Sequence, residues 1–224
     1  MYKRQVRFLC DAGGDKDKEE DWKSPLIAAS WRGHLEVVRF LCEAGANKDN
    51  ALDKAVERST PLIAASRSGH LDVVRFLCDA GAEKDKEEDS QNLLITASLK
   101  GHLDVVRFFY ERGVDKDKAV EGWTPLIAAS WRRHLEVVRL LCQAGANKDN
   151  AVDGLTALIT ASLKGHLDVV RFLCEAGSDK DKEEDSMTPL ISASMIGHLE
   201  LVRFLCEAGA DRGMRAENLS LIHI

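Results

Sequence analysis

The sequence predicts an all-α solenoid in which tandem helix pairs stack one after another. Three observations support this fold class. A unit of similar residues recurs, with its first position at Ser24, Thr60, Asn92, Thr124, Thr156 and Thr188. The spacing is 36 residues once and 32 residues thereafter, and a period of this size is the signature of a repeat array. Each unit also holds two apolar stretches at helical spacing, separated by a turn residue that is usually glycine.

Each unit begins with a helix-start signal. Thr124 can cap a free backbone N–H, and Pro125 suits the first helical position because no donor is needed there. All four prolines hold this position: Pro25, Pro61, Pro125 and Pro189. We therefore expect a short apolar first helix in each unit. The third unit lacks the proline, and there we expect Asn92 to act as the cap.

The second helix of each unit follows a turn that is usually made by glycine, which adopts the left-handed conformation at low cost. The fourth unit has Arg133 at this position, so we expect a strained or reshaped turn that costs about 1 kcal/mol. The helix then runs from His134, with Leu135, Val138 and Leu141 on one face. The polar residues that follow are too few for another helix pair. They predict a projecting turn or hairpin.

The motifs T-P-L-x-x-A, G-H-L-x-V-V-x-x-L and A-G-A make the unit similar to the ankyrin repeat. The resemblance covers nearly the whole chain and implies antiparallel helix pairs with projecting, hairpin-like connectors. The spacing is one residue shorter than the usual 33 of that family. An isoleucine also replaces the histidine that the family usually has after T-P-L. These residues are Ile27, Ile63, Ile95, Ile127, Ile159 and Ile191.

We expect residues 1–224 to form a single array. Residues 1–23 match part of a unit, full units begin near residues 24, 60, 92, 124, 156 and 188, and residues 214–224 keep the register of another. The connector from Ala46 to Ser59 is four residues longer than the others, which predicts a longer tip or a break in the stack. Neither end resembles a polar capping repeat. We therefore expect a piece of a longer protein, with non-native final residues as the alternative.

The composition argues against several classes of function. A net charge of −6 without a long basic block argues against general nucleic-acid binding. No apolar run approaches the ~20 residues that span a bilayer, and the first residues lack the apolar core of a signal peptide. Phosphate loops, G-x-S-x-G motifs and spaced nucleophile–base pairs are absent from the sequence. We therefore expect no catalytic activity, no cofactor and no membrane insertion.

The cysteines hold one repeat position on the second helices: Cys10, Cys42, Cys78, Cys142, Cys174 and Cys206. Packed helices lie ~8–10 Å apart, whereas a disulfide needs Cα atoms within about 7 Å. We therefore expect buried, reduced thiols and a reducing, cytoplasmic location. The spacing of cysteines and histidines also fits no zinc motif.

Two further features are interpreted as structural. The histidines that open the second helices hold a fixed repeat position: His34, His70, His102, His134, His166 and His198. The acidic connector runs begin like a calcium loop but lack its central glycine and final glutamate, which favours solvated turns.

The two residues after the A-A-S segment and its variants differ among units. The first members are Trp31, Arg67, Leu99, Trp131, Leu163 and Met195, and the second members are Arg32, Ser68, Lys100, Arg132, Lys164 and Ile196. We call these residues the ladder. The ankyrin resemblance implies that they end the inner helix and face a concave groove used for partner contacts. Tryptophan and arginine are typical binding anchors, and Trp22 and Trp123, just before two caps, would extend the surface.

Three functional hypotheses follow from the ladder, from the incomplete repeats at the two ends and from the similarity of the units. The first is a non-catalytic protein-binding scaffold, whose groove and projecting turns take a segment with apolar and acidic residues. The alternative is a targeting or substrate-recognition arm of a larger enzyme or channel. A third is a mechanical spacer, which near-identical units fit but a varied ladder does not. For each single ladder residue, a side chain that folds back onto its own connector is the structural alternative.

Overall fold

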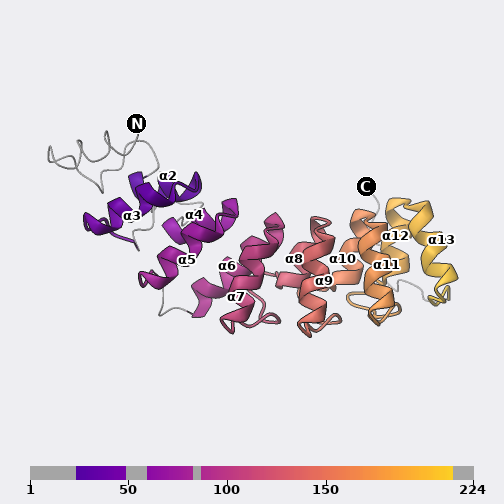
Figure 1. Ribbon diagram of the computed structural model, residues 1–224. Coiled ribbons are helices and arrows are strands. Elements are labelled where there is room, and N and C mark those ends of the chain that lie inside the picture. Colours follow the sequence, from indigo (N-terminus) through magenta and orange to yellow (C-terminus); the bar gives the residue numbers. More distant parts are fainter. Residues whose placement is uncertain (1–23, 49–59, 83–86, 214–224) are drawn as a thin grey trace. The chain divides into compact units, whose positions relative to one another are not determined.

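Helices arranged in pairs make up the part of the chain that the computed structural model describes, residues 24–48, 60–82 and 87–213 (Figure 1). The first helices are α2 (Pro25–Trp31), α4 (Pro61–Ser68), α6 (Glu87–Lys100), α8 (Pro125–Trp131), α10 (Ala157–Lys164) and α12 (Pro189–Ile196). The second helices are α3 (Leu35–Glu43), α5 (Leu71–Asp79), α7 (Leu103–Glu111), α9 (Leu135–Gln143), α11 (Leu167–Glu175) and α13 (Leu199–Glu207). The predicted all-α repeat fold is confirmed. Trp22, Cys10, the two end segments and most of the longer connector lie outside the described residues.

The chain divides into two compact units, residues 1–114 and residues 115–224. In the first unit, α4 packs between α2 and α6, and α5 contacts both α3 and α7. In the second unit, α10 packs between α8 and α12, and α11 contacts both α9 and α13. Within each unit, the first helices therefore form one layer and the second helices form another. The single array over residues 1–224 stays a prediction.

The predicted caps start the first helices. Thr124 Oγ1 accepts a hydrogen bond from the Ile127 N–H at 3.2 Å, and Thr156 Oγ1 accepts one from Ile159 at 3.1 Å. Ser24, Thr60 and Thr188 make the same bond. All four prolines stand at the first turn, as predicted. The side-chain oxygen thus satisfies a donor that the helix itself leaves unpaired.

The first helix of the third repeat begins earlier than the sequence predicts. α6 starts at Glu87, so Asn92 lies inside the helix and is not its cap. In the other repeats that have a proline, an earlier start would place that proline in the helix interior, where its ring clashes with the preceding turn. The fifth repeat also lacks the proline, yet α10 begins at Ala157 because Thr156 supplies a hydroxyl cap. The third repeat has neither the proline nor the hydroxyl cap, and its connector residues continue the helix. The prediction of a cap at Asn92 was therefore wrong.

The isoleucine that distinguishes these repeats packs into the core in four of the six repeats, whereas Ile63 and Ile191 are half-buried. Ile127 is 1 % exposed and Ile159 is fully buried in the second unit. Ile27 and Ile95 are also buried, and Ile27 packs with Ala64 of the next first helix. Burial of such side chains contributes about 1.5–3 kcal/mol each. Apolar packing therefore links successive first helices at this position within each unit.

Three connectors of the second unit form tight hairpin turns. The paired residues are Val120 with Trp123, Val152 with Leu155, and Glu184 with Met187. In the first turn, Glu121 and Gly122 have φ values of 51° and 79°. Positive φ at both central residues is typical of the turn that best joins two antiparallel strands. The predicted hairpin-like connectors are thus present in this unit.

The acidic connector residues bind the backbone of the following connector. Asp117 Oδ1 accepts a hydrogen bond from the Asn147 N–H at 2.7 Å. The same bond recurs from Asp179 to Asp149 Oδ1 at 3.0 Å and from Asp211 to Asp181 Oδ1 at 2.7 Å. Hydrogen bonds to an ionised carboxylate are stronger than neutral ones. Asp181 belongs to an acidic run that was interpreted as a solvated turn, and that interpretation was incomplete, because this carboxylate, like those of Asp117 and Asp149, joins successive repeats.

Candidate binding surface

Histidines of the following repeat fix the backbone of the ladder. The Nε2–O distances are 3.1 Å for His70 and Trp31, 2.9 Å for His102 and Arg67, 3.1 Å for His166 and Trp131, and 3.3 Å for His198 and Leu163. In each case the acceptor is a backbone carbonyl, which can only accept, so the imidazole Nε2–H donates. These four histidines are thus structural, as predicted. They also hold the ends of the first helices against the next repeat.

The glycine turn makes room for this histidine. Gly165 has a φ of 72°, and a Cβ added there would overlap the ring of His198. A Cβ at Gly69 would overlap the ring of His102 in the same way. The glycine therefore serves two needs, a left-handed backbone and a close approach by the neighbouring ring.

Exposure differs among the ladder residues. Trp31, Met195 and Ile196 are exposed by 41 %, 45 % and 56 %. The second-member cations Arg32, Lys100, Arg132 and Lys164 are exposed as well. Arg67, Leu99, Trp131 and Leu163 are half-buried. The ladder thus presents apolar surface at both units and carries cations but no acidic residue.

A cluster of Trp123, Trp131 and Lys164, which we call the tryptophan cluster, lies in the second unit. The Trp123 and Trp131 rings meet edge to face, with centroids 5.5 Å apart at 80°. Lys164 Nζ lies 3.5 Å from the centroid of the Trp131 ring. Edge-to-face and cation–π contacts each contribute roughly 0.5–1.5 kcal/mol. In the first unit, Trp31 stacks with its neighbour Arg32, whose guanidinium carbon is 4.9 Å from the ring centroid.

The position of Trp131 is compatible with both interpretations of this residue, a partner contact and a side chain that folds back onto its own connector. Its ring does pack on the connector that precedes its own helix, through Trp123. It remains half-buried and so still presents surface to solvent. The contact with Lys164 was not predicted, because the two residues lie 33 positions apart and only repeat stacking brings them together.

Arg133 adopts the strained turn that the sequence predicts. Its φ is 62°, in the left-handed region where the other repeats place glycine. The side chain reaches the first turn of α11, where Nε lies 3.1 Å from Asp168 Oδ1 and 3.2 Å from Oδ2. A left-handed non-glycine residue costs about 1–2 kcal/mol, whereas an exposed ion pair returns about 0–1 kcal/mol. The pair therefore does not fully offset the strain.

Replacing Arg133 with glycine should raise the free energy of unfolding by about 0.5–1 kcal/mol, because the strain is removed and only an exposed ion pair is lost. Urea denaturation followed by circular dichroism measures this change. Arg132→Gly is the matched control. Arg132 has a φ of −101°, so glycine relieves nothing there and should destabilise the fold. A loss of stability in Arg133→Gly would contradict the strain argument.

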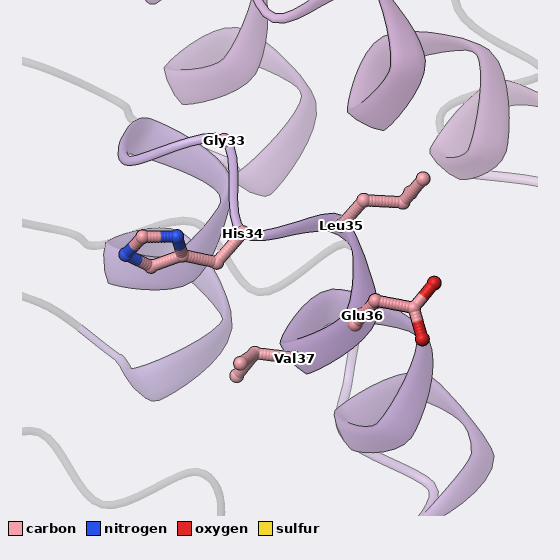
Figure 2. A pocket seen from close by; sticks show the side chains of 5 residues that line it. All are labelled: Gly33, His34, Leu35, Glu36 and Val37. Atoms are coloured by element: carbon pink, nitrogen blue, oxygen red, sulfur yellow. The ribbon is translucent and has the colours of Figure 1, made fainter. Parts of the chain in front are cut away.

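A hollow of about 430 Å³ lies at the start of α3, lined by Gly33, His34, Leu35, Glu36 and Val37 (Figure 2). The side chains of His34 and Glu36 point in different directions from this turn (Figure 2). One repeat later, the equivalent surface is covered, because His70 packs against Gly33 and bonds to Trp31. In the first described repeat, the hollow therefore lies on the face that the next repeat packs against its neighbour.

The cysteines within the described residues form no disulfide bond, and most are less deeply buried than expected. Cys78 is buried, whereas Cys42, Cys142, Cys174 and Cys206 are half-buried. Burial raises the pKa of the Cys142 and Cys174 thiols to about 11, with a partly opposing effect of a nearby lysine in each case. Burial disfavours the thiolate, because a charged sulfur loses its hydration. These thiols are therefore poor nucleophiles near neutral pH.

Alkylation of Cys142 and Cys174 at pH 8 should be roughly 100-fold slower in the folded chain than in urea, because a pKa near 11 leaves little thiolate. The contribution of these buried thiols to the free energy of unfolding should be fully present below pH ~9, where an exposed thiol is also neutral. It should fall as the pH rises from ~9 toward ~11, because the unfolded chain then loses the thiol protons more readily. Mass spectrometry of iodoacetamide-treated protein measures the first effect. Equal rates in the folded and unfolded chain would contradict the burial argument.

No group of three or more histidine, cysteine or acidic side chains within residues 24–48, 60–82 and 87–213 is placed to hold a metal ion. In the same ranges, no helix combines the length and the apolar character needed to cross a membrane.

Fold and surface together define a tandem helical repeat protein with an exposed ladder at the ends of its first helices. The family profile described as ankyrin repeats in three copies matches residues 2–88, 82–152 and 144–216. The chain belongs to the ankyrin repeat family. Its structure is similar to the crystal structure of the human ASB11 ankyrin repeat domain, with a TM-score of 0.77 and 27 % identity over 86 % of this chain and 87 % of that chain. A search of curated proteins found no match.

Ankyrin repeats generally serve as protein-interaction scaffolds, and the fold is typically a non-catalytic binding module. This general role agrees with the structure of the ladder, whose backbone is fixed by the following repeat while several of its side chains remain exposed.

Proposed function

We propose that this chain is a non-catalytic protein-binding scaffold whose contact surface is the ladder together with the projecting turns. The observation that supports the proposal most is the tryptophan cluster. Trp131 is held by a hydrogen bond to its carbonyl, an edge-to-face contact with Trp123 and a cation–π contact with Lys164. Anchors that are already ordered lose little conformational entropy on binding. Such an arrangement is typical of an interaction hot spot.

The partner segment should carry apolar and acidic residues. The ladder offers exposed apolar surface at Trp31, Met195 and Ile196. Its charged members are all cations: Arg32, Arg67, Lys100, Arg132 and Lys164. A carboxylate-bearing segment is complementary to this surface, although the chain as a whole has a net charge of −6. The repeat phase also continues at 32 residues from Asn92 to Thr124, across the boundary of the two units, and we propose one array on that basis.

Affinity capture with matched baits tests the proposed function. The baits are the intact chain, the Trp131→Ala/Arg132→Ala variant and an Arg139→Ala variant, each incubated with an extract of the cells that express the gene. Mass spectrometry identifies proteins that are retained. A partner that the intact chain and Arg139→Ala retain, and the ladder variant loses, supports the proposal. Identical protein sets on all three baits would show that the ladder makes no selective contact.

A further inference from the structure

The substitution of glycine by Arg133 has no explanation in stability. Five of the six repeats have glycine at this position, Gly33, Gly69, Gly101, Gly165 and Gly197. In the fourth repeat, arginine occupies the left-handed conformation with a φ of 62°. The strain of about 1–2 kcal/mol exceeds the contribution of an exposed ion pair. A strained residue that persists without a stability gain points to a role in function.

The side chain of Arg133 is oriented but remains accessible. Asp168 receives the Nε–H through both carboxylate oxygens, at 3.1 and 3.2 Å. The Arg133 side chain is still 63 % exposed. Within the described residues, the structure gives no partner to its two terminal nitrogen atoms. One edge of the guanidinium group is therefore fixed, and the other donors face solvent.

Arg133 lies close in sequence to Trp131 of the tryptophan cluster. It follows Trp131 by two residues, and exposed Arg132 lies between them. Lys164, from the next first helix, adds a further positive charge over the Trp131 ring at 3.5 Å. An apolar surface and several cations thus meet at the end of α8. An anion bound here would have an aromatic contact next to it.

We propose that Arg133, oriented by Asp168, receives a carboxylate group of the partner segment next to an apolar side chain that packs on Trp123 and Trp131. The inference rests on the proposed binding function and adds a specific acidic position to it. A guanidinium group matches the two oxygens of a carboxylate, and it binds phosphate by the same geometry. Arg133 is thus a contact residue, and Asp168 is a positioning residue.

A selected peptide provides the probe. A displayed library of random 16-residue peptides is selected on the intact chain, and one enriched peptide with an essential glutamate is synthesised in three forms. The forms carry glutamate, glutamine or phosphoserine at that position, and fluorescence anisotropy gives the affinity of each. We expect the glutamate form to bind about three- to fivefold more tightly than the glutamine form. The phosphoserine form shows whether the site accepts both anions.

The variants Arg133→Gly and Asp168→Asn separate the roles of the two residues. Arg133→Gly should bind the glutamate and glutamine forms equally. Asp168→Asn removes a negative charge, so electrostatics alone would strengthen binding of the acidic peptide, whereas loss of positioning should weaken it about threefold. Asp104→Asn is the matched control. Asp104 holds the same repeat position as Asp168, but the preceding repeat has Gly69 where Arg133 stands before Asp168. It should leave the glutamate preference unchanged.

Two outcomes would overturn different claims. A glutamate preference that survives in Arg133→Gly, or increases in Asp168→Asn, would overturn the assignment of Arg133 while leaving the scaffold in place. Selection of no peptide that requires Trp131, tested with Trp131→Ala, would overturn the proposed function itself and the carboxylate position with it.

Discussion

Replacing Ile159 with alanine should lower the free energy of unfolding by about 2–5 kcal/mol. Ile159 is fully buried in α10, which packs against both α8 and α12. The substitution removes apolar contacts on both sides, and rigid neighbouring helices cannot close the space that it leaves. The loss should appear as an earlier urea transition of the helical circular dichroism signal.

Leu163→Ala is the matched control for Ile159→Ala. Leu163 stands one turn later on the same helix but is only half-buried, so its truncation should cost clearly less. Because repeat arrays can unfold in parts, the transition midpoint and its slope should be compared together. A cost below about 1 kcal/mol for Ile159→Ala would contradict the view that the isoleucine column holds successive first helices together.

The double variant Trp131→Ala/Arg132→Ala should reduce affinity for a partner or selected peptide at least tenfold, a loss of about 1.4 kcal/mol or more. Truncation removes an ordered aromatic anchor and an exposed cation from the same helix end. Isothermal titration calorimetry measures the change. The free energy of unfolding should fall by about 1–3 kcal/mol, because the truncation also removes the contacts of the Trp131 ring with Trp123 and Lys164.

Two controls accompany the double variant. Arg139→Ala removes an exposed cation from α9, a second helix that carries no ladder residue, and it should bind with unchanged affinity. Circular dichroism of each variant establishes that the repeats remain folded. Unchanged affinity in the folded double variant would show that the ladder is not the contact surface.

Local chemistry made much of the fold predictable. The Thr-Pro pairs fixed the starts of helices because a hydroxyl cap and a missing N–H act within one turn. Arg133 was expected to be strained for a similarly local reason, since glycine holds the equivalent position in the other repeats. The start of α6 was missed because Asn92 was assigned as a cap in a repeat that has neither the proline nor the hydroxyl cap of the others.

Contacts between repeats were harder to predict. The contact between Lys164 and Trp131 and the bond between Asp117 and Asn147 join residues about one repeat apart in sequence. Their side-chain directions depend on how far one helix pair is displaced and rotated from the next, which the sequence period does not specify. The period could therefore place the ladder on one helix end, but it could not show that Trp131 packs on Trp123.

Hydrogen–deuterium exchange of the second unit, free and bound to the selected peptide, tests the central claim most directly. If the ends of the first helices form the contact surface, exchange should slow at the C-terminal ends of α8 and α10 and in the turns that follow them. The middle and C-terminal parts of α9, α11 and α13 should exchange at unchanged rates. Protection confined to these second helices, with none at the ladder, would contradict the account.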